Sequence, residues 1–339
     1  MERKALAICV PTYNRKDKLL PRIMNLLLIE DNRFYIVVKD NCSTDGTKEE
    51  LKSIKDSRLI YIENENNVGG QRNPWQTLLE GTKYAYNVIL CLDKDRIEAH
   101  NLSDFINFLI KERPKVGYAD LNLKTDAEKS VVGYKKDSLK RMGYIFRHPT
   151  GYFYDAESYK KTLKEVLTFD ELQTFPFVFD IIAAHISAQN NSFVYSKPLV
   201  FTETRDEVKI IKSFTYNSDN LHFSPKYVQY EFPVFLRDLY SLPIDKKQII
   251  NKAQSLLWHM LLKVSLSYKT IMSNEELCEH HGIDTQKINY TTMIKNLLPV
   301  GKTFIYESKR QIGLFRSYFV VISESCFALL VILKNCIRK

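Results

Sequence analysis

The sequence predicts an α/β fold in which a mostly parallel central sheet is flanked by helices and is followed by a mainly α-helical C-terminal region. Three observations lead to this prediction. In the first 125 residues, short β-rich apolar runs alternate with longer amphipathic stretches. Polar residues cluster directly after each of the first four apolar runs. Beyond about Ser224 the apolar residues recur with a helical period, most regularly over Gln248–Ser267.

The first part of the predicted fold consists of four strands separated by three helices. The strands are expected at Ala5–Val10, Tyr35–Val38, Leu59–Ile62 and Val88–Leu92, and the helices at Lys16–Glu30, Thr47–Lys55 and Pro74–Tyr86. Apolar runs this short, separated by helical patterns, indicate parallel strands joined by crossover helices. The later elements are expected to be a strand at Val116–Leu123, a loop at Arg147–Tyr154, a helix at Phe175–Ala188 and short strands at Ser192–Tyr195 and Leu199–Phe201.

The composition is that of an ordinary globular protein, because 45% of the residues are hydrophobic and 26% are charged. The formal net charge of +9 favours anionic partners but does not choose between nucleotides and phospholipid surfaces. Nucleic acid is not expected as a partner, because the net charge is the only feature of the sequence that would support it. The six cysteines form no CxxC pair and the N-terminus does not read as a signal peptide, so we expect a reducing, cytoplasmic setting.

The polar clusters stand where a parallel sheet binds ligands, outside the carboxyl ends of its strands. The clusters PTYNR, KDNCSTDGT, ENENNVGGQRN and DKDR follow the first four predicted strands in order. In the second cluster, Asp40 ends a strand beside a helix N-terminus, which suits the hydroxyl and N–H donors of a nucleotide but also suits a capped βα turn. The third cluster adds consecutive glycines and Arg72, and it fits neither GxGxxG nor a Walker loop.

The fourth cluster contains two aspartates, Asp93 and Asp95, directly after an apolar run. Carboxylate oxygens together with substrate phosphates are the usual ligands of Mn²⁺ or Mg²⁺. Strand alternation would turn Lys94 away and leave both acids on one side. A strand that simply ends in aspartates is the alternative, and the motif alone does not decide between the two.

In order and spacing, the segments CVPTYNR, VVKDNCSTDGT, ENENNVGGQRN and LDKD resemble family 2 glycosyltransferases of the GT-A fold, which is Rossmann-like. The resemblance is good over about the first 100 residues and loose over the next 100. It implies a GT-A domain over residues 1–220, with a nucleotide-sugar half at about 1–100 and an acceptor half at about 101–220. The helical region would then occupy residues 221–339.

The resemblance implies an inverting transfer from a nucleotide-diphospho-sugar, usually UDP-linked, to a hydroxyl of a glycan or lipid-linked acceptor in capsular or other surface-polysaccharide biosynthesis. Carried over by position, the donor-binding residues are Pro11, Thr12, Asn14, Asp40, Asn67, Gly70, Arg72, Asn73 and Asp93. Asp95 corresponds to the ligand of the divalent metal, and His222 is a candidate second ligand. Lys94 departs from the family, where small, apolar or acidic residues are usual, and this puts the metal affinity in question.

An inverting transfer also needs a general base for the acceptor hydroxyl. The resemblance implies an acid at a helix start, and Asp180 stands at that position, although Phe179 replaces the companion acid that usually precedes it. Alternative bases are Asp155, Glu157 and Asp170. The acceptor-loop candidates are His148 and Gly151, and candidate residues of a loop over the donor diphosphate are Arg205, Lys209 and Lys212.

The C-terminal segment contains an apolar run from Tyr318 to Leu333 that is interrupted by Ser323–Ser325. We expect a helix over residues 304–333 with a narrow polar stripe and a wide apolar face. Docking within the chain, homo-oligomerisation and peripheral contact with an anionic cytoplasmic membrane all fit this pattern.

Two other functions are weighed against a glycosyltransferase. A non-catalytic relative that keeps the nucleotide pocket would be expected to lack Asp95 or every base candidate, and both are present. A nucleotidyltransferase would carry a Gly-rich loop with Arg or Lys after the first strand, where this chain has PTYNRKDK. Both are less favoured than the transfer of a sugar.

Overall fold

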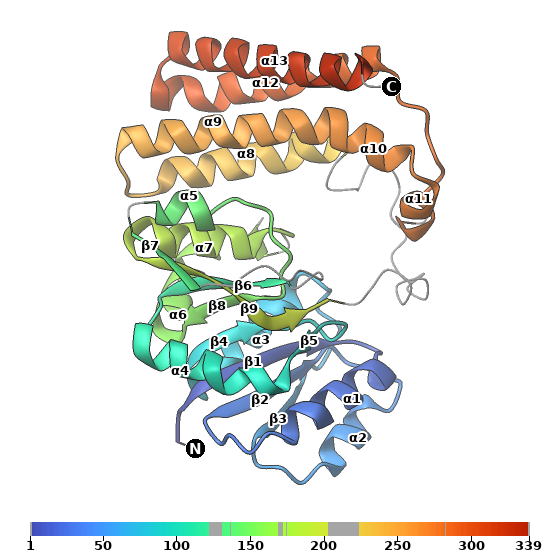
Figure 1. Cartoon of the computed structure of the whole chain (residues 1–339), viewed down its shortest axis with the longest axis vertical. Coiled ribbons are helices and arrows are strands. Elements are labelled where there is room, and N and C mark those ends of the chain that lie inside the picture. Colours follow the sequence, from blue (N-terminus) through green and yellow to red (C-terminus); the bar gives the residue numbers. More distant parts are fainter. Residues whose placement is uncertain are drawn as a thin grey trace. The chain divides into compact units, whose positions relative to one another are not determined.

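The computed structural model describes residues 2–121, 131–135, 137–168, 172–173, 175–202, 224–281 and 283–337. The chain separates into two compact units, Met1–Glu203 and Thr204–Lys339, which are described one at a time (Figure 1). The boundary predicted between residues 220 and 221 lies outside the described residues.

The first unit is built on a mixed sheet that contains nine strands among the described residues. The strands are β1 (Lys4–Thr12), β2 (Phe34–Asp40), β3 (Leu59–Glu63), β4 (Ala85–Leu90), β5 (Arg96–Ile97), β6 (Val116–Leu121), β7 (Val131–Tyr134), β8 (Tyr152–Asp155) and β9 (Ser192–Phe201). The helices are α1 (Lys16–Leu27), α2 (Thr47–Ser53), α3 (Arg72–Gly81), α4 (Leu102–Glu112), α5 (Ser138–Met142), α6 (Ala156–Val166) and α7 (Val178–Gln189), and a short 3₁₀ helix spans Ala99–Asn101.

The strand order is β3-β2-β1-β4-β8-β6-β9-β5, and β7 pairs with β9. Strands β1, β2, β3 and β4 run parallel, with Thr12 opposite Asp40 and Asp40 opposite Glu63. Their carboxyl ends therefore lie at one edge of the sheet, and the four polar clusters follow them there. The first four predicted strands and their parallel order are confirmed.

Side-chain alternation along β1 divides the core of this unit into two layers. Leu6, Ile8 and Val10 belong to a buried cluster with residues of α1 and α4. Ala7 and Cys9 point the other way, toward α3, where a Cβ added to Gly81 would lie only 2.3 Å from the sulfur of Cys9. Glycine at this position lets α3 approach the sheet closely, which fixes the loop that precedes α3.

The second half of the sheet corrects three predictions. Four of its pairings are antiparallel, so the sheet is mixed rather than mostly parallel. The predicted loop at Arg147–Tyr154 contains the start of β8, whose aromatic side chains are buried on both faces and show no polar alternation. The two short strands after Ser192 form one strand, β9, because a register shift opposite β6 accommodates Pro198, which has no N–H to donate.

The end of the predicted strand at Val88–Leu92 is also corrected. Strand β4 spans Ala85–Leu90, so it begins and ends earlier than predicted. The helix predicted at Pro74–Tyr86 is α3, which ends at Gly81, before this strand begins. Asp93 and Asp95 lie in a turn closed by a hydrogen bond from Asp95 N to Leu92 O at 2.9 Å. Strand alternation therefore does not set the directions of the two acids.

The second unit is helical, as predicted, and contains seven described helical segments. They are α8 (Pro225–Ser241), α9 (Lys246–Leu262), a π-helical segment (Lys263–Ser267), α10 (Tyr268–Met272), α11 (Glu275–His281), α12 (Tyr290–Ile312) and α13 (Leu314–Ile337). The single helix predicted over residues 304–333 is wrong, because Gly313 at φ +92° separates α12 from α13.

Candidate functional site

The carboxyl edge of β1 and β2 holds three of the predicted donor-binding residues. Pro11 and Thr12 end β1, opposite Lys39 and Asp40 of β2. Asp40 is fully buried, and its carboxylate accepts hydrogen bonds from Ser43 Oγ at 2.5 Å and from the hydroxyl of Tyr61 at 2.8 Å. Both oxygens of Asp40 are therefore held by the protein in this structure.

Asn14 joins the loop after β1 to the loop after β2. Its side-chain oxygen accepts from Thr44 N at 2.8 Å, and its own N–H donates to Ser43 Oγ at 2.9 Å. Asn14 has φ +51°, a conformation that asparagine tolerates better than most residues. Two of the four polar clusters are thus held together by Asn14 and Ser43.

An amide network organises the loop after β3. Asn67 Oδ1 accepts from Asn41 Nδ2 at 2.7 Å, and Asn64 Nδ2 donates to Asn41 Oδ1 and to Asn73 Oδ1, both at 3.0 Å. Asn73 is buried and donates to the carbonyl of Lys39 at 3.0 Å. Asn67 and Asn73, both predicted to contact the donor, here fix the loop on the end of β2.

In the same loop, Gly70 has open space where a Cβ would lie, and the side chain of Arg72 binds Gln173. No heavy atom among the described residues lies within 4 Å of a Cβ added at Gly70. The guanidinium of Arg72 donates to Gln173 Oε1, and the indole of Trp75 donates to Gln173 O at 3.1 Å. The structure thus joins Arg72 to the segment before α7, a contact that the sequence did not indicate.

Asp93 is held by cations that the sequence reasoning did not assign. Its carboxylate accepts from Arg15 Nη1 at 2.7 Å and from Thr12 Oγ1 at 3.1 Å, and its carbonyl accepts from Arg22. Burial raises the pKa of Asp93, whereas the charge of Arg15 and its hydrogen bond act in the opposite direction. Thr12 and Asp93, both predicted to bind the donor, are thus in direct contact.

Asp95 differs from Asp93 because one of its carboxylate oxygens accepts no hydrogen bond from the described residues. Asp95 Oδ2 accepts from the hydroxyl of Thr150, and this hydroxyl accepts from Leu92 N at 3.0 Å. Asp95 Oδ1 is buried and has no hydrogen-bond partner among the described residues. A buried carboxylate oxygen without a donor is the arrangement expected of a ligand to a hard cation that also binds substrate phosphates.

The remaining metal prediction concerns His222, whereas His148 was predicted only for the acceptor loop. Within the described part of the chain no three His, Cys, Asp or Glu side chains gather into a metal-binding group. His148 Nδ1 lies 3.7 Å from Asp95 Oδ2, but it accepts a hydrogen bond from Thr150 N, and burial lowers the pKa of His148. His222 lies outside the described residues. Asp95 thus fits one end of a metal site that a substrate diphosphate would complete.

The loop from Gly143 to Gly151 connects Asp95 to Asp180. Asp180 is buried in the first turn of α7, and its Oδ1 accepts from Ile145 N and Phe146 N at 2.9 Å each. Tyr152 donates to the same oxygen at 3.0 Å, and the described residues give Oδ2 no hydrogen bond. Burial raises the pKa of Asp180, although these donors act against the rise.

This loop has an unfavourable backbone conformation that Asp180 stabilises. Tyr144 and Phe146 have φ values of +52° and +60°, which large side chains rarely adopt. The carboxylate of Asp180 accepts hydrogen bonds from the N–H groups of Ile145, which lies between them, and of Phe146. Asp180 and Asp95, at the two ends of the loop, are thus held by the same segment.

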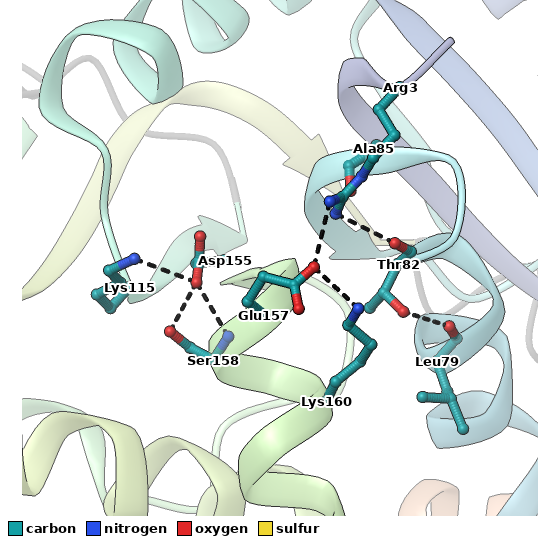
Figure 2. Close-up of polar contacts among 9 residues, drawn as sticks. All are labelled: Arg3, Leu79, Thr82, Ala85, Lys115, Asp155, Glu157, Ser158 and Lys160. Carbon is teal, nitrogen blue, oxygen red and sulfur yellow. Dashed lines mark hydrogen bonds and ion pairs between the residues drawn. The ribbon is translucent and has the colours of Figure 1, made fainter. Parts of the chain in front are cut away.

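Two of the alternative base candidates, Asp155 and Glu157, do not reach this edge. Asp155 pairs with Asn87, near the start of β4, because β8 runs antiparallel to β4. Figure 2 shows Asp155 between Lys115 and Ser158, and Glu157 between Arg3 and Lys160. Both acids lie at the sheet edge opposite the DKD turn, where they cap α6 and anchor Arg3.

The fourth base candidate and three cations of the predicted donor loop lie outside the described residues. They are Asp170, Arg205, Lys209 and Lys212.

Gly151 illustrates how tightly this loop is built, and Gly151→Ala is expected to destabilise the protein by about 1–3 kcal/mol. Gly151 has φ +105°, and an added Cβ would lie 2.4 Å from the carbonyl oxygen of Ala119. Gly70→Ala is the matched control, since its Cβ meets open space, and it should change stability by less than about 0.5 kcal/mol. Equilibrium urea unfolding measures both, and equal effects would contradict this account.

Arg15→Met is expected to lower stability by about 1.5–3 kcal/mol, because it leaves the buried Asp93 without its main counter-charge. The side chain of Asp93 is 7% exposed and that of Arg15 is 23% exposed. Lys83→Met, which removes the exposed partner of Glu80, should cost less than about 0.5 kcal/mol. Thermal and urea unfolding of both variants test the difference, and a neutral Arg15→Met would refute it.

Residues that build the site but carried no sequence prediction include Arg15, Tyr61 and Thr150. Arg15 stands inside the cluster PTYNR and Thr150 inside the predicted loop at Arg147–Tyr154, so position in these segments was an available signal. Tyr61 lies on β3 among other apolar residues, and nothing in the local sequence sets it apart.

Residues 7–150 match the family model described as Glycosyl transferase family 2. A poly-beta-1,6-N-acetyl-D-glucosamine synthase of Staphylococcus aureus is 25% identical over 134 residues, which are 39% of this chain and 32% of the relative. The Escherichia coli UDP-Glc:alpha-D-GlcNAc-diphosphoundecaprenol beta-1,3-glucosyltransferase WfaP is 27% identical over 124 residues, 36% of this chain and 47% of the relative. The chain thus spans less than half the length of either relative.

Among solved structures, S. aureus TarS residues 1–349 in complex with UDP-GlcNAc align with a TM-score of 0.56 at 15% identity. The alignment covers 94% of this chain and 91% of that one. A longer TarS structure gives a TM-score of 0.58 at 16% identity and covers 95% of this chain and 54% of that one. These similarities confirm the GT-A-like fold and the helical C-terminal region.

Proposed function

We propose that residues 7–150, which match the model of glycosyl transferase family 2, form a glycosyltransferase domain, and that this chain transfers a sugar, with inversion, from a nucleotide-diphospho-sugar to an acceptor hydroxyl. The donor is a UDP-sugar and the acceptor is a glycan or lipid-linked glycan of a surface polysaccharide. Two similar proteins, a polysaccharide synthase and a UDP-Glc-dependent transferase that acts on a diphosphoundecaprenol acceptor, support this substrate class.

The observation that carries the proposal is the buried, unpartnered Oδ1 of Asp95 at the carboxyl edge of β4. A divalent ion, Mn²⁺ or Mg²⁺, bound there would neutralise charge that develops on the departing diphosphate. Asp95 would hold it together with the diphosphate oxygens, which is a common ligand set for Mg²⁺. Thr150 fixes the other oxygen of Asp95, so the free oxygen has a defined direction.

The protein residues have three roles in the proposed reaction. Asp180 Oδ2 accepts the proton of the acceptor hydroxyl, whose oxygen forms the bond to the anomeric carbon while the bond to the nucleoside diphosphate breaks. Asp180 Oδ1 stays on Ile145 N and Phe146 N and keeps the carboxylate oriented. Asp93, held by Arg15 and Thr12, faces the ribose or sugar of the donor, and Pro11, Asn14 and Asp40 lie along the nucleotide.

Binding and turnover together test the proposal. Thermal unfolding of the full chain with UDP-, GDP-, CDP- and TDP-sugars in the presence of Mn²⁺ should show a stabilisation with one donor class. That donor should release its nucleoside diphosphate when acceptor is added, and the product should have the opposite anomeric configuration. Stabilisation without any turnover would favour the non-catalytic relative. Pyrophosphate release from a nucleoside triphosphate and a sugar phosphate would favour a nucleotidyltransferase.

We also propose that the chain works in the cytoplasm at the inner face of the membrane, where lipid-linked acceptors present their sugars. The basic composition supports this site of action.

A further inference from the structure

Helix α13 has a buried face that includes two polar residues, and it exposes eight large apolar side chains. It packs against α12 and α9 within the second unit (Figure 1). The buried face carries Ser317, Val320, Glu324, Ala328 and Ile332. The exposed face carries Leu314, Phe315, Tyr318, Phe319, Ile322, Phe327, Leu330 and Leu333, and Phe315 is 91% exposed. A helix that completed a soluble core would be oriented the other way, so the outer face of α13 marks a docking surface.

The inner contacts of α13 show why the helix does not simply rotate. Glu324 is buried and accepts a hydrogen bond from Gln254 Nε2 of α9 at 2.6 Å. Ser317 is fully buried. A Cβ added to Gly301 of α12 would lie 2.9 Å from Val321, so the two helices are in close contact. Rotation would break the bond to Glu324 and separate this close packing.

A basic hollow adjoins the start of α13. It has a volume of about 520 Å³ and is lined by Arg237, Tyr240, Ser241, Tyr306, Glu307, Lys309, Arg310 and Gln311. Three of these residues are cationic and one is acidic. Gln311 is only three residues before Leu314, the first exposed apolar residue of α13. A site for an anionic head group and a surface for acyl chains therefore lie next to each other in the chain.

The charges distinguish a lipid surface from a second copy of this chain. Helices α12 and α13 carry six Lys or Arg residues and two Asp or Glu residues, and Glu324 is one of the two. Two copies that met through this surface would bring like charges together. Anionic phospholipids would instead attract the cations while the apolar side chains enter the boundary of the acyl region.

We propose that the outer face of α13, with the basic hollow beside it, docks onto an anionic phospholipid membrane, and that α13 lies parallel to its surface. The helix Leu314–Asn335 is long and apolar enough to cross a bilayer. Crossing would place Glu324 near the middle of the hydrocarbon, where a carboxylate is costly, and would break its bond to Gln254. The inference does not depend on the proposed sugar transfer, since vesicles alone test it.

Vesicle flotation of the full chain, without sugar donor or acceptor, is the test. The chain should float with vesicles that contain phosphatidylglycerol, should bind pure phosphatidylcholine vesicles much less, and should be released by high salt or alkaline carbonate. The double variant Phe315→Ser/Phe319→Ser should weaken binding to the anionic vesicles at least about tenfold. Met24→Ser/Leu28→Ser, which changes exposed apolar residues of the first unit, should not.

A charge-reversal pair tests the basic hollow. Lys309→Glu/Arg310→Glu should weaken binding to the anionic vesicles at least about tenfold, whereas Lys161→Glu/Lys164→Glu on exposed positions of α6 should have little effect. Circular dichroism and thermal unfolding must show that each variant folds like the wild type.

Three outcomes would overturn the inference. The folded wild-type chain could fail to float with anionic vesicles, or it could remain in the membrane after carbonate extraction, as a spanning helix does. Analytical ultracentrifugation could instead show a dimer without lipid that Phe315→Ser/Phe319→Ser abolishes, which would assign the face to a second copy.

Discussion

Asp95→Asn is expected to lower kcat/KM for sugar transfer by at least about 100-fold without unfolding the protein. Asparagine has nearly the same volume and keeps an oxygen for the hydroxyl of Thr150. The turn is closed by the backbone bond from Asp95 N to Leu92 O, which the substitution does not touch. What is lost is the negative charge at the buried Oδ1, and with it the affinity for a divalent ion.

Activity titrated with Mn²⁺ and Mg²⁺, after treatment with a chelator, measures this effect directly. The wild type should lose activity on chelation and regain it with metal, whereas Asp95→Asn should not be rescued. Lys94→Ala is the matched control in the same turn. It should retain activity and reach half-maximal rate at a lower metal concentration, because a cation next to the site is removed. Full activity of Asp95→Asn would remove the metal from the proposal.

The first half of the fold was predictable because its signals are local. Each of β1 to β4 is an apolar run that ends in polar residues, and parallel pairing follows from the helices between them. The second half was not, because β8 is aromatic on both faces and follows a Pro/Gly-containing loop. Its pairing with β4 joins segments more than 60 residues apart, which no local pattern encodes.

The candidate site, too, was only partly predictable from the sequence. Asp93 and Asp95 were predicted from the end of an apolar run and Thr12 from the family resemblance, and the structure brings Thr12 and Asp93 into contact. The pairing of Asp93 with Arg15 and of Arg72 with Gln173 depends on how loops fold over the sheet edge. Residue type told us that these side chains were polar, but their partners follow from the tertiary structure. Asp40, read as a nucleotide ligand, also binds Ser43 and Tyr61 for the same reason.

Asp180→Asn is expected to lower kcat by about 10²–10⁴-fold while leaving donor affinity nearly unchanged. Asparagine can still accept the hydrogen bonds of Ile145 N and Phe146 N through its oxygen, so the loop should keep its conformation. Asp180→Ala is a poorer test, because it would leave both buried N–H groups without an acceptor. Donor binding by calorimetry and product formation under saturating donor separate the two effects, and an unchanged kcat would move the base elsewhere.

The pH dependence makes the assignment of Asp180 more specific. Burial raises the pKa of Asp180, so the folded protein favours the protonated acid, and a base with this environment loses activity as the pH falls through the raised pKa. The acid limb of kcat/KM should therefore lie above the ordinary range of an aspartate. The same shift means that the charged carboxylate costs stability, and this cost is absent at low pH and appears as the pH rises from the unfolded-state pKa to the raised folded-state pKa. Asp180→Asn should thus gain stability relative to the wild type as the pH rises, while its residual activity loses the acid limb. A variant that keeps the wild-type acid limb would show that another group titrates there.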